Sequence, residues 1–153
     1  MSVCTFIASD LPLAEFSPAQ DYPLEIKIDN GAATINDGGA DDNYFIHIFD
    51  DVENYTRKKY GVWLEWDYTD GRATQILEYI KNALNNTDSI ELWRVWLMYC
   101  YDYEESPIVQ KKTVSIKEFS INHIREINSA EIWNKPDKNI PSRPSFYCLT
   151  IKK

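Results

Sequence analysis

Basic residues are almost missing from the first third of this 153-residue sequence. Residues 1–56 contain a single base, Lys27, against eleven acids, a net charge of −10. The other 97 residues carry fifteen bases and thirteen acids, a net charge of +2, so the whole chain has the formal charge of −8. A strongly negative field attracts basic partners and repels nucleic acid and anionic lipid. We therefore expect a basic protein partner, no nucleic acid and no membrane.

Glycine, cysteine and long apolar runs are also scarce. Five glycines leave little room for a phosphate-binding loop. The three cysteines, Cys4, Cys100 and Cys148, are an odd and widely spaced set that argues against a disulfide framework. No run approaches the ~20 apolar residues needed to cross a bilayer, and the first residues lack the basic start and apolar stretch of a signal peptide. We expect a cytoplasmic protein.

Aromatic and apolar residues, in contrast, are plentiful. Aromatic residues make up 14% of the chain and hydrophobic residues 44%, which is typical of a folded protein and not of a disordered one. The sequence contains no internal repeat, low-complexity tract or linker. A chain of this length can bury a sizeable core, so we predict a single domain over residues 1–153.

Two segments have the periodicity of amphipathic helices. In the longer one, residues 71–85, six apolar residues recur at helical spacing, and Thr69 or Asp70 can accept hydrogen bonds from the first turn. A short second helix is expected from Ser120 to Ile127, with isoleucines on its inner side.

The remaining apolar segments predict strands, at residues 3–8, 24–29, 44–49, 60–68, 90–101, 112–116 and 146–151. Leu24, Ile26 and Ile28 alternate with charged residues, which indicates a half-buried strand, and residues 30–43 are expected to form a loop with tight turns. Residues 90–101 are apolar on both faces, as in an interior strand. We predict an α+β fold, in which the main helix and the short second helix pack on a largely antiparallel sheet of six or seven strands.

The segment Asn36–Asn43 is the best candidate for a metal-binding loop, because it combines carboxylates with a glycine bend. Its spacing is not that of the twelve-residue calcium loop, and the bidentate Glu of such loops is missing. A solvated turn, in which Asp and Asn side chains bond their own backbone, explains the composition better. We predict no bound metal and no cofactor.

Catalytic signatures are also missing. The three cysteines lie in apolar strands, where inert thiols are expected. Glu65 and Asp67 lie among aromatic residues and could form a general acid–base pair, but a solvent-facing strand edge is the better interpretation. The alternative enzyme hypothesis is a small hydrolase or metal-binding domain that uses His47 with Asp41 and Asp42. We predict no catalytic residues and no enzymatic activity.

Acidic and aromatic residues alternate over a segment that suits recognition of a basic protein, where carboxylates match Lys and Arg side chains and aromatic residues act as anchors. The predicted partner-binding residues are Asp37, Asp41, Asp42, Tyr44, Asp50, Asp51, Glu53, Tyr55, Trp63, Glu65 and Asp67. Two other hypotheses remain. The aromatic residues can all be core while the acids keep the protein soluble, or they can mediate self-association of an oligomeric scaffold subunit.

Four segments, Ser2–Ala8, Asp37–Asn43, Tyr60–Trp66 and Pro144–Ile151, look like those of small bacterial proteins of uncharacterised type. In size, charge and overall character the chain resembles the cytosolic immunity proteins of bacterial polymorphic-toxin and contact-dependent inhibition systems. Those proteins are compact, often acidic domains that occupy the active site or a flanking surface of a cognate toxin, commonly a basic nuclease. The resemblance implies a toxin inhibitor and assigns no individual residue.

The expected binding surface combines the loop 36–43, the segment 50–55 and the aromatic residues near 60–68. Carboxylates at its rim should speed encounter with a basic partner, whereas aromatic anchors such as Tyr44 or Trp63 should set the residence time.

Overall fold

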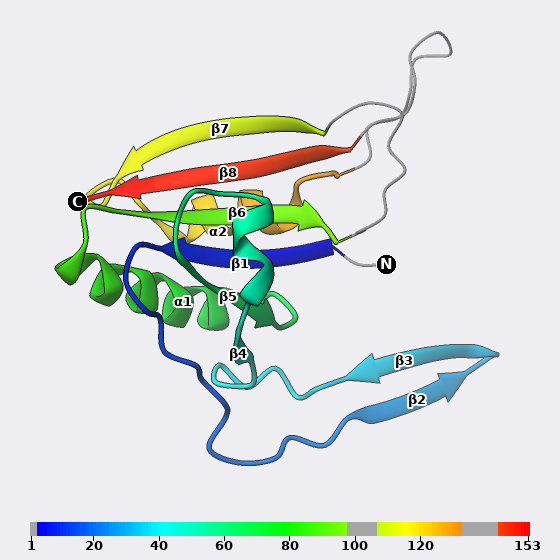
Figure 1. Ribbon diagram of the computed structural model, residues 1–153. Helices are drawn as coiled ribbons and strands as arrows, with labels where there is room; N and C mark the ends of the chain where they lie inside the picture. The colour runs from blue at the N-terminus through cyan, green and yellow to red at the C-terminus, as the bar shows by residue number, and fades with distance from the viewer. Residues whose placement is uncertain (1–2, 98–106, 133–143) are drawn as a thin grey trace, which may run out of the picture.

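The computed structural model describes residues 3–97, 107–132 and 144–153 (Figure 1). Its strands are β1 (Val3–Ser9), β2 (Glu25–Asp29), β3 (Ala32–Asn36), β4 (Phe45–Ile48), β5 (Tyr60–Glu65), β6 (Ser89–Trp96), β7 (Ile108–Ser115) and β8 (Ser145–Lys152). Its α-helices are α1 (Asp70–Ala83) and α2 (Ile121–Ser129), and its 3-10 helices are η1 (Asp50–Asn54) and η2 (Leu84–Asn86).

Six of the strands form one mixed sheet, in the order β4-β5-β1-β6-β8-β7. Every neighbouring pair in it is antiparallel except β7 and β8, which run parallel. The parallel pair follows from the connection through α2, because two parallel strands need a long crossover. The prediction of an α+β fold with a largely antiparallel sheet is confirmed. The predicted strand number is not, because β2 and β3 form a separate two-stranded sheet among the described residues.

Both α-helices cover one face of the six-stranded sheet and contact each other. The sequence directs this packing, because Ala73, Ile76 and Ile80 recur on one side of α1 and are fully buried. The Thr69 hydroxyl oxygen accepts a hydrogen bond from the Arg72 amide at 3.1 Å and caps the first turn. Ile124 is the buried residue of α2. The predicted positions of both helices are confirmed.

The opposite face of the sheet carries no α-helix among the described residues, and η1 with its flanking residues packs on part of it. Phe49 and Val52, at the start of and within η1, pack with residues of β1, β6 and β8 in a second apolar cluster. Gly61 of β5 allows this close approach, since a Cβ atom there would lie 2.9 Å from the Val52 Cβ atom. Figure 1 shows η1 in front of the sheet, on the side away from α2. We call this side of the sheet the open face.

β6 lies between β1 and β8, which confirms the prediction of an interior strand for residues 90–96. Its predicted end, residues 98–101, lies outside the described residues. β8 also lies inside the sheet, because β7 pairs with its outer edge.

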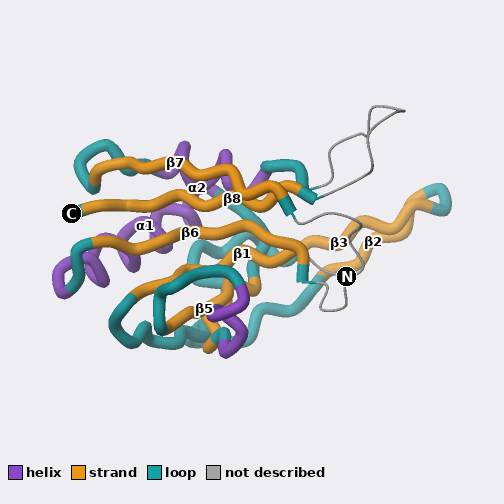
Figure 2. The backbone as a smooth tube through the Cα atoms, turned by 45° about the horizontal axis from the view of Figure 1, so that its top comes forward, coloured by secondary structure: helices purple, strands orange, loops and turns teal. Residues whose placement is uncertain are grey.

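The two-stranded sheet projects from the body as an arm, residues 24–36 (Figures 1 and 2). Two predictions were wrong here. Every residue of β2 is exposed, although its alternating pattern indicated a half-buried strand, and β3 lies within the predicted loop 30–43. The turn explains the second error. Asn30 and Gly31 have φ angles of 50° and 80°, as in the Asn-Gly hairpin turns that match the twist of paired strands.

Candidate functional site

The predicted partner-binding residues fall into two separate groups. The first group lies around the N-terminus of α1 and contains Asp37, Asp41, Asp42, Tyr44 and Asp67. The second belongs to η1, the residue after it, and β5, and contains Asp50, Asp51, Glu53, Tyr55, Trp63 and Glu65. The two groups are held by different contacts.

Arg72 of α1 organises the first group. Its side chain is only 1% exposed and its Nη1 atom lies 3.0 Å from Asp37 Oδ2. Its Nε donates to the Ala40 carbonyl oxygen and its Nη1 to the Asp67 carbonyl oxygen, each at 2.9 Å. The hydrogen bond from Arg72, with that from the Gly39 amide, holds the pKa of Asp37 below its ordinary value. The charge of Asp37 is thus compensated inside the protein.

The other members of the first group are also held by neighbours. The Asp41 carboxylate lies directly against Gly71, where a Cβ atom would be 1.9 Å from Asp41 Oδ1. Asp42 accepts a hydrogen bond from the Tyr22 hydroxyl, which raises the pKa of Tyr22. These contacts order the loop between β3 and β4 against the end of the helix.

Tyr44 is a core residue. It is 5% exposed, stacks on Phe16 at a ring-centroid distance of 4.5 Å, and donates its hydroxyl to Gln75 Oε1 at 2.9 Å. Burial raises the pKa of Tyr44, with a smaller contribution from the charge of Asp42. The expectation that Tyr44 is an accessible anchor is therefore wrong, because its ring is already packed inside the protein.

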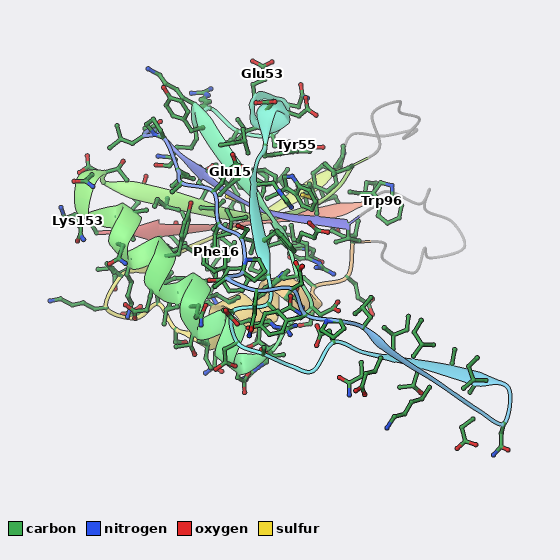
Figure 3. All side chains as sticks on the ribbon, turned by 90° about the horizontal axis from the view of Figure 1, so that it is seen from below. Glu15, Phe16, Glu53, Tyr55, Trp96 and Lys153 are labelled. Carbon is green, nitrogen blue, oxygen red and sulfur yellow. The ribbon has the colours of Figure 1, made fainter. Side chains whose placement is uncertain are left out.

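The second group lies on the open face. The acids of η1 all lie in its first turn, and Asp50 and Glu53 are exposed. Figure 3 shows Glu53 at the outer edge of the molecule and Tyr55 nearer the sheet. Tyr55 packs against Phe6 and Phe146 at centroid distances of 5.5 and 5.9 Å. It is half-buried and supports η1 on the sheet.

Trp63 and Glu65 lie further along the same face. Trp63 is half-buried, and its ring lies 4.6 Å from the ring of His47 on the neighbouring strand. His47 Nε2 is 2.6 Å from Glu65 Oε2. Of the predicted aromatic anchors, Tyr55 and Trp63 keep part of their surface accessible.

A groove of about 800 Å³ separates the segment 53–58 from β6, β8 and β7. Glu91 lines the groove and accepts hydrogen bonds from the Thr56 hydroxyl and, at 2.9 Å, from Trp93 Nε1. Lys58 Nζ lies 3.0 Å from Asp10 Oδ2 and donates to Ser89 Oγ at 2.8 Å. The groove therefore presents charges of both signs next to the acidic η1.

Sequence reasoning missed Arg72 and the groove residues Thr56, Lys58 and Glu91. The buried position of Arg72 could have been predicted, because Arg72 lies four residues before Ile76 and therefore shares the buried side of α1. The groove could not have been predicted from the sequence. Thr56 and Glu91 are 35 residues apart in the chain, and only the tertiary fold brings them into contact.

Cys148 lines the groove but is buried. Burial, with a further contribution from the charge of Glu91, raises the pKa of the Cys148 thiol to about 12. A thiol with such a pKa is almost entirely protonated near pH 7 and is a poor nucleophile. This agrees with the prediction of an inert cysteine in an apolar strand.

The structure does not bring His47 together with Asp41 and Asp42, the residues of the alternative hydrolase hypothesis. His47 contacts Glu65, whereas Asp41 lies against Gly71 and Asp42 accepts from Tyr22. Over residues 3–97, 107–132 and 144–153, no group of three or more His, Cys, Asp or Glu side chains is placed to hold a metal ion. In the same ranges, no helix is long and apolar enough to cross a membrane.

Comparison of the chain with protein-family models, curated proteins and solved structures finds no match. Its function has to be inferred from its own geometry and charge.

Proposed function

We propose that this protein is an acidic protein-binding module, and that it acts as an immunity protein that neutralises a basic toxin domain such as a nuclease. One observation carries the proposal, namely that the acids of the first third of the chain are largely presented to solvent. The exposed ones include Glu15, Asp21, Glu25, Asp29, Asp50 and Glu53. By covering the active site or substrate surface of the toxin, such a module would exclude the toxin's substrate.

The division of the predicted residues supports a specific docking face. Asp37 is neutralised by Arg72, and Asp42 accepts a hydrogen bond from the Tyr22 hydroxyl. Asp50 and Glu53 of η1 are instead exposed, and Figure 3 shows Glu53 at the outer edge of the molecule with the half-buried Tyr55 nearer the sheet. An accessible acidic rim next to an aromatic ring is the arrangement that guides a basic partner and then anchors it.

The genetic test is direct. If the gene immediately upstream encodes a secreted toxin, its C-terminal domain expressed alone should arrest growth, and co-expression of this protein should restore it. Growth arrest that persists despite equal amounts of both proteins would contradict the immunity function.

The kinetic test compares two variants that each remove two negative charges. Asp50→Asn with Glu53→Gln should slow association with the toxin domain strongly in 0.05 M salt and weakly in 0.5 M salt, because the Debye length falls from more than ~10 Å to a few Å. Glu78→Gln with Glu118→Gln, two exposed acids outside the first third, is the matched control. Association rates come from stopped-flow fluorescence. Equal slowing by both variants would assign the effect to net charge alone.

A further inference from the structure

The arm carries an apolar face that nothing in the described part of the chain covers. Ile26, Ile28 and Ile35 are 64%, 77% and 66% exposed, and Leu24 before them is 62% exposed. β2 and β3 pair with each other and with no strand of the six-stranded sheet. Figures 1 and 2 both show the arm extending away from the body.

The register places the apolar side chains on one side of the arm. Ile26 is opposite Ile35 and Ile28 is opposite Ala33, whereas Lys27 is opposite Thr34. Because side chains alternate between the two faces of a strand, the isoleucines share one face, and the charged residues of β2 occupy the other. This alternation is typical of a sheet with one covered face.

An arm that stayed in water would gain nothing from this pattern. A two-stranded hairpin is at best marginally stable by itself, and isoleucines left exposed on one face add no packing. Contiguous exposed apolar residues on a soluble protein mark a surface that another molecule covers. The Asn30-Gly31 turn meanwhile fixes the hairpin shape before any partner arrives.

We propose that the isoleucine face of the arm docks into an apolar groove on the same basic protein partner, an inference that rests on the proposed function. Charge identifies the partner. The segment 21–36 carries Asp21, Glu25 and Asp29 against Lys27 as its base. Glu25, Lys27 and Asp29 lie on the other face of the same two-stranded arm, so only one sheet layer separates their net negative charge from a molecule that covers the isoleucines. This charge favours a partner with Lys and Arg side chains around its apolar groove.

A second copy of this chain fits the arm less well. Each copy of this chain carries a formal charge of −8, so two arms that approach through their isoleucine faces bring two like-charged molecules together.

The arm and η1 then have different kinetic roles. The exposed acids of η1 raise the association rate by long-range attraction, whereas the isoleucines, once desolvated, slow dissociation. Loss of the isoleucines should therefore act on the off-rate and should be insensitive to salt.

The first experiment identifies the occupant in cells that make the full-length protein. The photo-crosslinker p-benzoylphenylalanine replaces Ile28 of the arm or, as a control, the exposed Glu78 of α1. We expect an adduct with a basic polypeptide from position 28 and not from position 78, identified by mass spectrometry. An adduct with a second copy of this chain, or no adduct specific to position 28, would overturn the arm proposal.

The second experiment uses the partner protein that the crosslink identifies, purified without the crosslinker. The triple variant Ile26→Ser, Ile28→Ser and Ile35→Ser should dissociate from this partner at least about tenfold faster than the parent, at low and at high salt. Its association rate constant should change little. The matched control is Ala32→Ser with Thr34→Ser, on the other face of the arm. Both variants should keep the far-UV circular dichroism of the parent, since the arm residues are exposed.

The outcomes separate the two proposals. If the triple variant dissociates like the parent while Asp50→Asn with Glu53→Gln still slows association, the arm proposal fails and the proposed function stands. If position 28 captures an acidic or neutral protein whose association is insensitive to salt, the proposed function fails, and the arm proposal fails with it because it names a basic partner.

Discussion

At the residue scale, Arg72 is the side chain on which the order of the acidic loop depends. It is buried, and its donors bind Asp37, the Ala40 carbonyl oxygen and the Asp67 carbonyl oxygen. Sequence reasoning treated the loop as a binding surface, because a run of carboxylates gives no sign of a cation 35 residues away in the chain. Asp37 of this loop therefore has a structural role, because it is paired with Arg72 within the protein.

Replacing Arg72 with Leu should lower the free energy of unfolding by about 3–5 kcal/mol, since it leaves Asp37 and two carbonyl oxygens without their donor. Urea denaturation followed by tryptophan fluorescence measures the change. Arg125→Leu is the control, because its ion pair with Asp70 lies on the surface and should contribute little. Equal losses of unfolding free energy in the two variants would show that Arg72 stabilises the protein no more than a surface ion pair does.

The same ion pair predicts a pH dependence. The pKa of Asp37 is lowered from its ordinary 3.8, chiefly by the hydrogen bond from Arg72, so the folded state favours the ionised carboxyl. Its contribution to stability is full above the unfolded pKa and is lost as the pH falls through the folded pKa. Asp37→Asn should therefore destabilise the protein at pH 7, and the difference from the parent should shrink below about pH 4. Urea midpoints at pH 7, 4 and 3 test this, and a constant difference would contradict it.

The buried thiols should be unreactive in the folded protein. Burial raises the pKa of Cys4 and of Cys148 to about 12, so few thiolates exist at pH 8. Iodoacetamide at pH 8 should leave both cysteines unmodified for hours and should modify them within minutes in 8 M urea, as shown by peptide mass mapping. Rapid modification of Cys148 in the folded state would mean that reagent reaches its thiol through the groove without unfolding.

At the scale of elements, Gly61 sets how closely η1 approaches the sheet. Gly61→Ala would place its Cβ atom 2.9 Å from Val52 Cβ and 3.3 Å from the Phe49 carbonyl oxygen, so η1 has to move outward. We expect a destabilisation of about 1–3 kcal/mol. Thermal unfolding compares this variant with Gly71→Ala, where only the exposed Asp41 side chain has to move. A loss confined to Gly71→Ala would contradict the tight packing of η1.

Periodicity alone located several elements. The apolar stripe predicted α1, the isoleucines predicted α2, and the two-faced apolar run predicted the interior position of β6. The helical stripes are local in the sequence, and the two-faced apolar run directly indicates a strand that is covered on both faces. The arm was predicted wrongly for a physical reason, since alternating isoleucines indicate a face suited to burial but do not show whether the six-stranded sheet or its helices cover that face. The parallel pairing of β8 with β7 depends on the path of α2 and leaves no mark in the strand sequences.

At the scale of the molecule, the chain divides its tasks between a body and its additions. The six-stranded sheet with α1 and α2 forms the main core. Negative charge is concentrated instead in the segments that lead to or lie over this body, namely the arm, the loop that Arg72 holds, and η1. Such a division allows these segments to carry a strong negative field without placing like charges inside the core.

The ends of the large sheet also bear on how concentrated this protein can become without aggregating. A free outer strand offers unpaired backbone groups to other molecules. At β4 this template is interrupted, because Phe16 and Ile46 exchange backbone hydrogen bonds of 3.0 and 2.9 Å. At β7 the exposed Lys111 and Lys112 repel an approaching copy of the same strand. Both ends of the large sheet therefore oppose edge-to-edge pairing, whereas the isoleucines of the arm remain exposed.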